Sequence, residues 1–353
     1  MRVLLLGSKG QFENRVISGT DRYMYELAKN FKILKPRNIG IEKANYNTLP
    51  FFRNGFTPFI HSLIDEFSNY DIIHNLDMVP VSHLRYGNAT SITTLHDFRA
   101  VTVPDMNPEA HAGLRGFLSY HLILLQGIKS LLNSDYLVAN STQTRNEAVK
   151  LGFDRRKIFV ANHGIDERFL SGSGKKMRNS ERFKVGYIGT LSFVKNLPFA
   201  IKAFMKVRDD SASFEIYGSQ KFEYEKLAKL AGSDKRIRFM GFAPENKIIS
   251  IYDSFDVFVT PTLYEGFCLP ILEAQARGLP VVIYKKAILP EEVRRYCFEA
   301  EDEDDMARII EEIRENGYDH TRMQQAKRYA RGFTWMRLAR QMIGIYRDIA
   351  KMQ

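Results

Sequence analysis

Two glutamates stand eight residues apart in the stretch TLYEGFCLPILEAQARGLPVV. Pro270 suits the first turn of a helix, where its missing N–H costs nothing, and Gly278 suits the end of that helix. Unpaired amides at a helix start can bind an anion or a polyol, and a carboxylate can accept two adjacent sugar hydroxyls. Glu265 and Glu273 therefore predict a site for a hydroxyl-rich anion. The alternative is that Glu273 only stabilises the helix start and Glu265 is a solvated loop residue.

A lysine and a histidine stand near the ends of predicted strands elsewhere in the chain. Lys195 belongs to GTLSFVKN, which follows a strand and opens a helix, so its ammonium group can neutralise phosphate oxygens. His96 follows the buried strand of TTLHDF and faces the edge at which parallel sheets bind ligands. Gly19 and Thr20 precede a helix and can present amides to a ligand. The alternatives are an exposed lysine, a histidine satisfied by local backbone and a simple capping turn.

Sheets must position these residues, and the sequence predicts two of them. Short apolar runs alternate with amphipathic stretches, which indicates parallel strands with helices on both faces. The predicted strands are Val3–Gly7, Asp71–His74, Ser91–Leu95, Tyr136–Ala139, Ile158–Val160, Lys184–Ile188, Ser213–Tyr217, Ile237–Met240, Val257–Val259 and Pro280–Tyr284, and the predicted helices include Arg22–Phe31 and Thr142–Leu151.

The organisation along the chain predicts two doubly wound α/β domains. We expect a first domain over residues 1–170, a linker over 171–183 because SGSGKKMRNSERF is small and polar, and a second domain over 184–333. Residues 334–353 form a final helix with one apolar stripe, made of Trp335, Leu338, Met342, Ile345 and Ile349.

The composition excludes several classes of protein. The chain has 353 residues, a net charge of +10 and two cysteines, so a disulfide framework and a cysteine-based metal site are excluded. We expect a soluble cytoplasmic protein, since its longest uncharged stretch, within 116–128, is too short to span a bilayer. Residues 322–351 hold eight Lys/Arg and one acid. That basic segment is either a solvated face or a contact for an anionic membrane; no nucleic-acid-binding motif is present.

Taken together, these segments resemble the retaining glycosyltransferases of family 4, which have the two-Rossmann glycosyltransferase-B fold. The resemblance covers nearly the whole chain. Its motifs are SGTDRYMYELA, TLHD, NHGID, GTLSFVKN, YEGFCLPILEAQARGLPVV and FTWMRLA, of which the paired-glutamate segment is the most specific. The resemblance implies that the final helix crosses back to pack on the first domain.

The resemblance also implies roles for individual residues. The catalytic group would be His96, near the reacting end of the donor sugar, Lys195 on the diphosphate, and Glu265 near the sugar and diphosphate. Glu273 would bind the ribose. The remaining donor-binding positions would be Gly19, Thr20, Thr190, Gly218, Met240, Gly241, Gly266, Phe267, Cys268 and Leu269.

Two departures from the family pattern concern the donor site. The family commonly carries an arginine a few residues before the lysine or immediately before it, where this chain has Thr190 and Val194. Cys268 replaces the usual glycine of E-G-F-G and adds bulk close to the sugar.

The resemblance implies sugar transfer from a uridine or guanosine diphosphate sugar to a hydroxyl of a saccharide or lipid. Anomeric configuration would be retained through front-face attack, with no metal and no cofactor besides the donor substrate. The main alternative is a catalytically weak subunit that binds nucleotide sugar for another transferase. A sugar-nucleotide epimerase and a nicotinamide-dependent oxidoreductase are further alternatives, and the second is disfavoured because Gly7-Ser8-Lys9-Gly10 does not make G-x-G-x-x-G.

Overall fold

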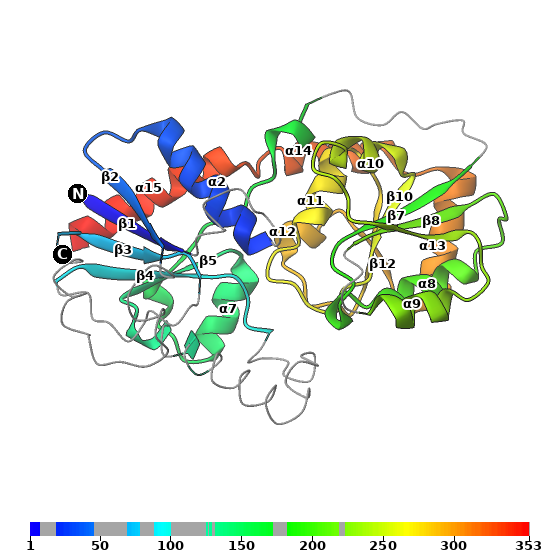
Figure 1. Cartoon of the computed structure of the whole chain (residues 1–353), viewed down its shortest axis with the longest axis horizontal. Helices are drawn as coiled ribbons and strands as arrows, with labels where there is room; N and C mark the ends of the chain where they lie inside the picture. Colours follow the sequence, from blue (N-terminus) through cyan, green and yellow to red (C-terminus); the bar gives the residue numbers. More distant parts are fainter. Residues whose placement is uncertain are drawn as a thin grey trace. The chain divides into compact units, whose positions relative to one another are not determined.

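The computed structural model describes residues 1–7, 19–45, 69–77, 88–99, 125, 127–128, 131–171, 182–218 and 223–352. The chain divides into two compact units (Figure 1). The first unit combines Met1–Gly164 with Thr334–Gln353, and the second is Ile165–Phe333. Most of the expected linker and of the uncharged stretch 116–128 lies outside the described residues.

The first unit is built on a parallel six-stranded sheet of order β2-β1-β3-β4-β5-β6. Its strands are β1 (Arg2–Gly7), β2 (Gly40–Asn45), β3 (Ile72–Asn75), β4 (Thr90–Leu95), β5 (Tyr136–Ala139) and β6 (Ile158–Val160). Every residue of β3 and β4 is buried, as expected for parallel strands covered on both faces.

In the described part of the first unit, three helices accompany this sheet. They are α2 (Gly19–Leu34), α7 (Thr142–Lys150) and α15 (Trp335–Met352). Ser141 caps α7 by accepting a hydrogen bond from the amide of Thr144. The apolar stripe of α15 is buried along its whole length, and α15 packs against α2.

The second unit has a parallel six-stranded sheet of order β12-β11-β10-β7-β8-β9. Its strands are β7 (Lys184–Ile188), β8 (Ser213–Tyr217), β9 (Ile237–Gly241), β10 (Val257–Thr260), β11 (Val281–Tyr284) and β12 (Phe298–Ala300). Its helices are α8 (Leu197–Met205), α9 (Tyr224–Ala231), α10 (Ile248–Ser254), α11 (Leu269–Ala276), α12 (Glu291–Arg294), α13 (Glu303–Asn316) and α14 (His320–Ala330).

Two apolar cores cover the two faces of this second sheet. Val257, Val259 and Val282 pack with α8 and α13. The intervening residues Phe258 and Val281 pack with α10, α11 and the end of α14. Successive side chains of a strand point to opposite faces, so the alternation places helices on both sides, as Figure 1 also shows. The predicted α/β class with two parallel sheets is confirmed.

All ten predicted strands are present, with ends that shift by at most one residue, and among the described residues two further strands were missed. The missed strands, β2 and β12, are both at the edge of a sheet. The sequence of β2 is GIEKAN, and β12 has three residues. Edge strands pair on one side only and tolerate charge, so they lack the apolar run that reveals a central strand.

The segment Ile165–Ser171 makes its contacts in the second unit, although the expected first domain includes most of it. The amide of Ile165 donates to the carbonyl of Phe333 at 3.0 Å. Arg277, which is buried, donates to the carbonyl of Phe169 at 3.2 Å and to that of Ser171. These long-range bonds are invisible to local sequence patterns.

Candidate functional site

Lys195 lies in a tight turn that follows β7. The turn is the short 3₁₀ helix η7 (Phe193–Lys195), and Asn196 after it has a left-handed φ of 51°. Helix α8 begins only at Leu197, so the lysine precedes the helix rather than opening it. Its ammonium group forms an ion pair with the carboxylate of Glu265. Lys195 is 23% exposed and Glu265 15% exposed, so the pair is largely screened from water without being sealed.

Backbone hydrogen bonds hold the two partners of this pair in place. The amide of Leu263 donates to the carbonyl of Val194 at 2.8 Å, and the hydroxyl of Thr262 reaches the same carbonyl at 3.0 Å. The amide of Glu265 donates to the carbonyl of Ile288 at 3.0 Å. The Thr262 hydroxyl also lies 3.2 Å from Oε1 of Glu265. The loop after β10 is thus tied to the loop after β7, which fixes both charges.

Helix α11 begins next to this pair. Cys268 is its N-cap residue and has a φ of 68°, in the left-handed region that favours glycine. Pro270 follows in the first turn. Phe267 is buried against Phe333, with ring centroids 6.1 Å apart. Burial raises the pKa of the Cys268 thiol, which is therefore protonated at neutral pH. Gly266 lies between the glutamate and this buried pair, and Leu269 is the first residue of α11.

Glu273 lies on α11 and is oriented by a buried tyrosine. The hydroxyl of Tyr252, on α10, donates to Oε2 of Glu273 at 2.7 Å. Burial, and then the charge of Glu273, raise the pKa of Tyr252, so the phenol remains a donor. Sequence reasoning missed Tyr252, because one aromatic residue in a helix is indistinguishable from a core residue until the fold is known.

The remaining predicted donor residues of the second unit lie at the ends of three adjacent strands, β7, β8 and β9. Thr190 follows β7, and its carbonyl accepts from the hydroxyl of Tyr187 at 2.9 Å. The amide of Gly218 donates to the carbonyl of Gly241 at 2.8 Å, and a Cβ at Gly218 would lie 2.2 Å from the carbonyl of Gly189. Only glycine fits there. Met240 is 45% exposed at the end of β9.

The other predicted residues belong to the first unit. Gly19 and Thr20 form the start of α2. His96 follows β4, and its Nε2 lies 2.9 Å from the carbonyl of Leu76, so Nε2 carries a hydrogen. Its buried Nδ1 has no hydrogen-bond partner within the described part of the chain. In the neutral tautomer this nitrogen is an acceptor.

A buried polar network in the first unit escaped the sequence analysis. We define the His74 network as Tyr346, His74, Thr94 and Tyr23. His74 bonds the Tyr346 hydroxyl through Nδ1 at 2.6 Å and the Thr94 hydroxyl through Nε2 at 2.8 Å. Thr94 in turn lies 3.0 Å from the Tyr23 hydroxyl. Burial, and then the charge of His96, lower the pKa of His74 to about 3, so this imidazole is neutral. The ring of Tyr23 packs on that of His96 at 5.0 Å.

Within the described ranges, no group of three or more His, Cys, Asp or Glu side chains could hold a metal ion. No helix in those ranges has the length and apolar character that crossing a bilayer requires.

Two families of known proteins together match nearly the whole chain. The family described as "Glycosyl transferases group 1" matches residues 173–332, and "Glycosyltransferase Family 4" matches residues 19–169. The O-antigen chain mannosyltransferase B of Escherichia coli is 24% identical over 285 residues, covering 76% of this chain and 73% of that protein. A D-inositol 3-phosphate glycosyltransferase of Corynebacterium efficiens is 32% identical over 241 residues, covering 61% and 57%.

Solved structures share the fold over the full length. HepE of Anabaena, solved with UDP and glucose, has a TM-score of 0.72 at 18% identity, covering 99% of this chain and 100% of that one. Sucrose-phosphate synthase of Thermosynechococcus elongatus has a TM-score of 0.74 at 15% identity, covering 100% of both chains.

Proposed function

Because this chain belongs to the group 1, family 4 glycosyltransferases, we propose that it transfers a sugar with retention of configuration. The donor is a uridine or guanosine diphosphate sugar, and the acceptor is a hydroxyl of a saccharide or lipid. HepE binds UDP and glucose, and that relative supports a nucleotide-sugar donor here.

The observation that carries the proposal is the ion pair between Lys195 and Glu265 at the start of α11. A diphosphate arriving there competes with Glu265 for the ammonium group and meets the amides of the helix start. Glu265 is then released to accept sugar hydroxyls, while Glu273, oriented by Tyr252, accepts the ribose hydroxyls. These fixed charges and dipoles stabilise the departing diphosphate.

The chemical step follows from the leaving group. We propose front-face attack, in which the acceptor oxygen bonds to the anomeric carbon as the bond to the diphosphate breaks, and a phosphate oxygen takes the acceptor proton. This route needs no covalent glutamate intermediate, no metal and no cofactor. His96 accepts a hydrogen bond from a sugar hydroxyl through Nδ1, because its Nε2–H is held by the Leu76 carbonyl. The amides of Gly19 and Thr20 cover the phosphates.

A second candidate is a nucleotide-sugar-binding subunit with little turnover of its own. Thr190 and Val194 occupy the positions at which the family commonly has an arginine, and the Val194 side chain is buried. Neither position therefore supplies the phosphate-binding positive charge that the family commonly has. Turnover by the purified chain distinguishes this candidate from an active transferase.

A thermal-shift screen followed by a transfer assay tests the proposal. A ligand that binds the native state raises its melting temperature, so one of UDP, GDP and their sugars should stabilise the protein. The stabilising sugar nucleotide should then be consumed with an acceptor present, giving a product with the donor's anomeric configuration. Stabilisation without turnover would favour the subunit reading, and no stabilisation by any of them would contradict both.

We further propose a cytoplasmic protein that contacts the inner face of an anionic membrane, where a lipid acceptor would lie. Exposed basic residues, Arg340, Arg347 and Lys351, lie on the side of α15 opposite its buried stripe. Flotation with anionic vesicles should carry the protein at low salt and release it at high salt. Equal behaviour with neutral vesicles would contradict the contact.

A further inference from the structure

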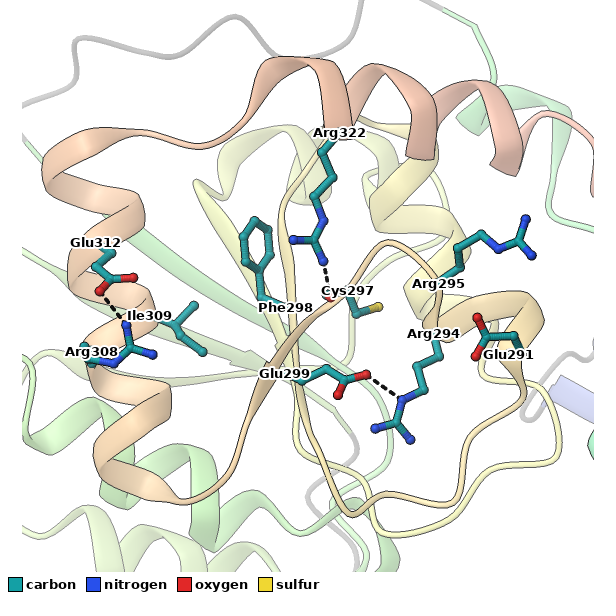
Figure 2. Close-up of a pocket in the computed structure, with 10 residues that line it drawn as sticks. All are labelled: Glu291, Arg294, Arg295, Cys297, Phe298, Glu299, Arg308, Ile309, Glu312 and Arg322. Carbon is teal, nitrogen blue, oxygen red and sulfur yellow. Dashed lines mark hydrogen bonds and ion pairs between the residues drawn. The ribbon is translucent and has the colours of Figure 1, made fainter.

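Two clusters of polar side chains lie outside the residues assigned to the donor site. The pocket in Figure 2 belongs to the second unit, and two of its arginines, Arg294 and Arg308, are paired with glutamates of its own lining. The His74 network belongs to the first unit and ends at Tyr23, whose ring packs on that of His96. The second cluster therefore contacts a residue with a proposed role in sugar transfer.

Three groups contact the His96 imidazole. Its Nε2–H donates to the carbonyl of Leu76 at 2.9 Å. The ring of Tyr23 meets it edge-on, with centroids 5.0 Å apart and ring planes at 78°. The ring of His163 lies 5.4 Å from that of His96 and 4.9 Å from that of Tyr23. The direction of the buried Nδ1, which we propose accepts a sugar hydroxyl, therefore depends on where the Tyr23 ring lies.

The hydroxyl of Thr94 holds Tyr23 in place. It lies 3.0 Å from the Tyr23 hydroxyl, on α2, and 2.8 Å from Nε2 of His74, on β3. Nδ1 of His74 lies 2.6 Å from the hydroxyl of Tyr346, on α15. All four side chains are buried, so a hydrogen bond lost inside the network leaves a polar group that water does not reach. Side chains from two helices and two strands thus fix the ring that contacts His96.

We propose that the His74 network positions the His96 imidazole for sugar transfer, with Thr94 and Tyr23 as positioning residues. This inference rests on the role proposed above for His96 at the donor sugar. A group displaced at the reacting end of a substrate slows the chemical step, and an interaction made mainly in the transition state affects kcat rather than KM. Loosening Tyr23 should therefore lower kcat.

Thr94→Val tests this proposal on the full chain. Valine is close in shape to threonine but lacks the hydroxyl, so kcat should fall about tenfold, while KM for the sugar nucleotide should change less than about twofold. Thr94→Ser keeps the hydroxyl and should restore kcat to within about twofold. Thr93→Val is the matched control, because Thr93 is equally buried in β4 but bonds the Ser134 hydroxyl at 2.6 Å instead. It should keep kcat.

The ¹⁵N chemical shifts of the imidazole provide a readout that does not require activity. His96→Gln identifies the His96 signals among those of the eight histidines. These signals should show the Nε2–H tautomer in the unmutated protein and in Thr93→Val. In Thr94→Val they should show a mixture of tautomers, because the imidazole no longer stays against the Leu76 carbonyl. Tyr23→Phe, which keeps the ring but removes the hydroxyl, should give the same mixture and serves if Thr94→Val does not fold.

The two readouts separate this inference from the proposed function. An unmutated protein without transferase activity would contradict the proposed function, and the imidazole signals would still decide whether the network positions His96. Unchanged imidazole signals in both Thr94→Val and Tyr23→Phe would overturn the inference. So would an unchanged kcat in an active protein, or losses in Thr93→Val or Thr94→Ser as large as that in Thr94→Val.

Discussion

The two units hold their polar groups in different ways. In the first, the His74 network is buried and neutral, since the pKa of its imidazole is lowered to about 3 and every link is a hydrogen bond between uncharged groups. In the second, Lys195 and Glu265 form an ion pair and stay partly exposed. A charge that is not sealed can exchange one partner for a ligand, whereas a buried neutral network cannot. The difference separates a network that positions elements from a pair that binds substrate.

The largest expected effect is on the exposed pair. Lys195→Ala should lower kcat/KM for the sugar nucleotide about 100-fold, because a fixed charge at the leaving group is lost. Steady-state kinetics on the folded variant measures it. Lys184→Ala is the matched control, since Lys184 pairs with Glu215 at 3.0 Å in the same sheet. Equal losses of kcat/KM in the two variants would show that any ion pair in this sheet affects activity. Lys195 would then have no specific role in donor binding.

The buried network should respond to acid instead of to substrate. The pKa of His74 is about 3 in the folded protein and about 6.5 when unfolded. The unfolded chain therefore binds more protons below pH 6.5, and stability falls as pH drops from about 6.5 toward 3. Between pH 7 and pH 5 His74 alone should cost about 2 kcal/mol.

Urea unfolding followed by the fluorescence of Trp335, the single tryptophan, reports on the first unit. His74→Gln should be less stable at pH 7 and should lose about 2 kcal/mol less between pH 7 and pH 5 than the unmutated protein. His163, whose pKa is also lowered by burial, remains in both proteins and cancels. Parallel pH dependences would contradict the role assigned to His74.

A smaller effect should follow from a substitution that leaves the Glu273 carboxylate in place but removes the hydrogen bond that orients it. Tyr252→Phe deletes the hydrogen bond to Glu273 and should weaken nucleotide binding about tenfold, because a bond to a charged group contributes about 1.5 kcal/mol. Calorimetry with the preferred nucleoside diphosphate measures it. Tyr264→Phe, another buried tyrosine of this unit, tests whether loss of a hydroxyl is enough; a similar loss there would remove the specific role of Tyr252.

The smallest effect should be at the cysteine that begins α11. Relief of a left-handed φ offsets the lost thiol and the added chain entropy, so Cys268→Gly should change the unfolding free energy by less than about 1 kcal/mol. Cys297→Gly, at a buried cysteine outside the set of positive-φ residues, should cost about 2 kcal/mol. Hydrogen exchange of the core amides of the second unit measures both. A cost at Cys268 as large as that at Cys297 would show that its backbone is not strained.

The sequence predicts central strands better than edges or side-chain networks. Val257–Val259 and Lys184–Ile188 are apolar runs whose burial on both faces leaves a local signature, whereas GIEKAN in β2 leaves none. Glu265 and Lys195 are 70 residues apart. Their positions near strand ends and the family resemblance suggested a shared site, and only the fold shows that the strands before them, β10 and β7, are neighbours. The hydrogen bond from Tyr252 to Glu273 depends on how α10 packs against α11. The His74 network depends on how α15 packs in the first unit. Local periodicity in the sequence carries no information about which helices pack together.

A crystal structure of the chain with an uncleaved sugar nucleotide tests the central claim most directly. The account predicts the diphosphate between the Lys195 ammonium group and the amides that begin α11, with the ribose hydroxyls on Glu273 and the Glu265 carboxylate turned toward the sugar. A nucleotide bound elsewhere, with the pair between Lys195 and Glu265 unchanged, would contradict it.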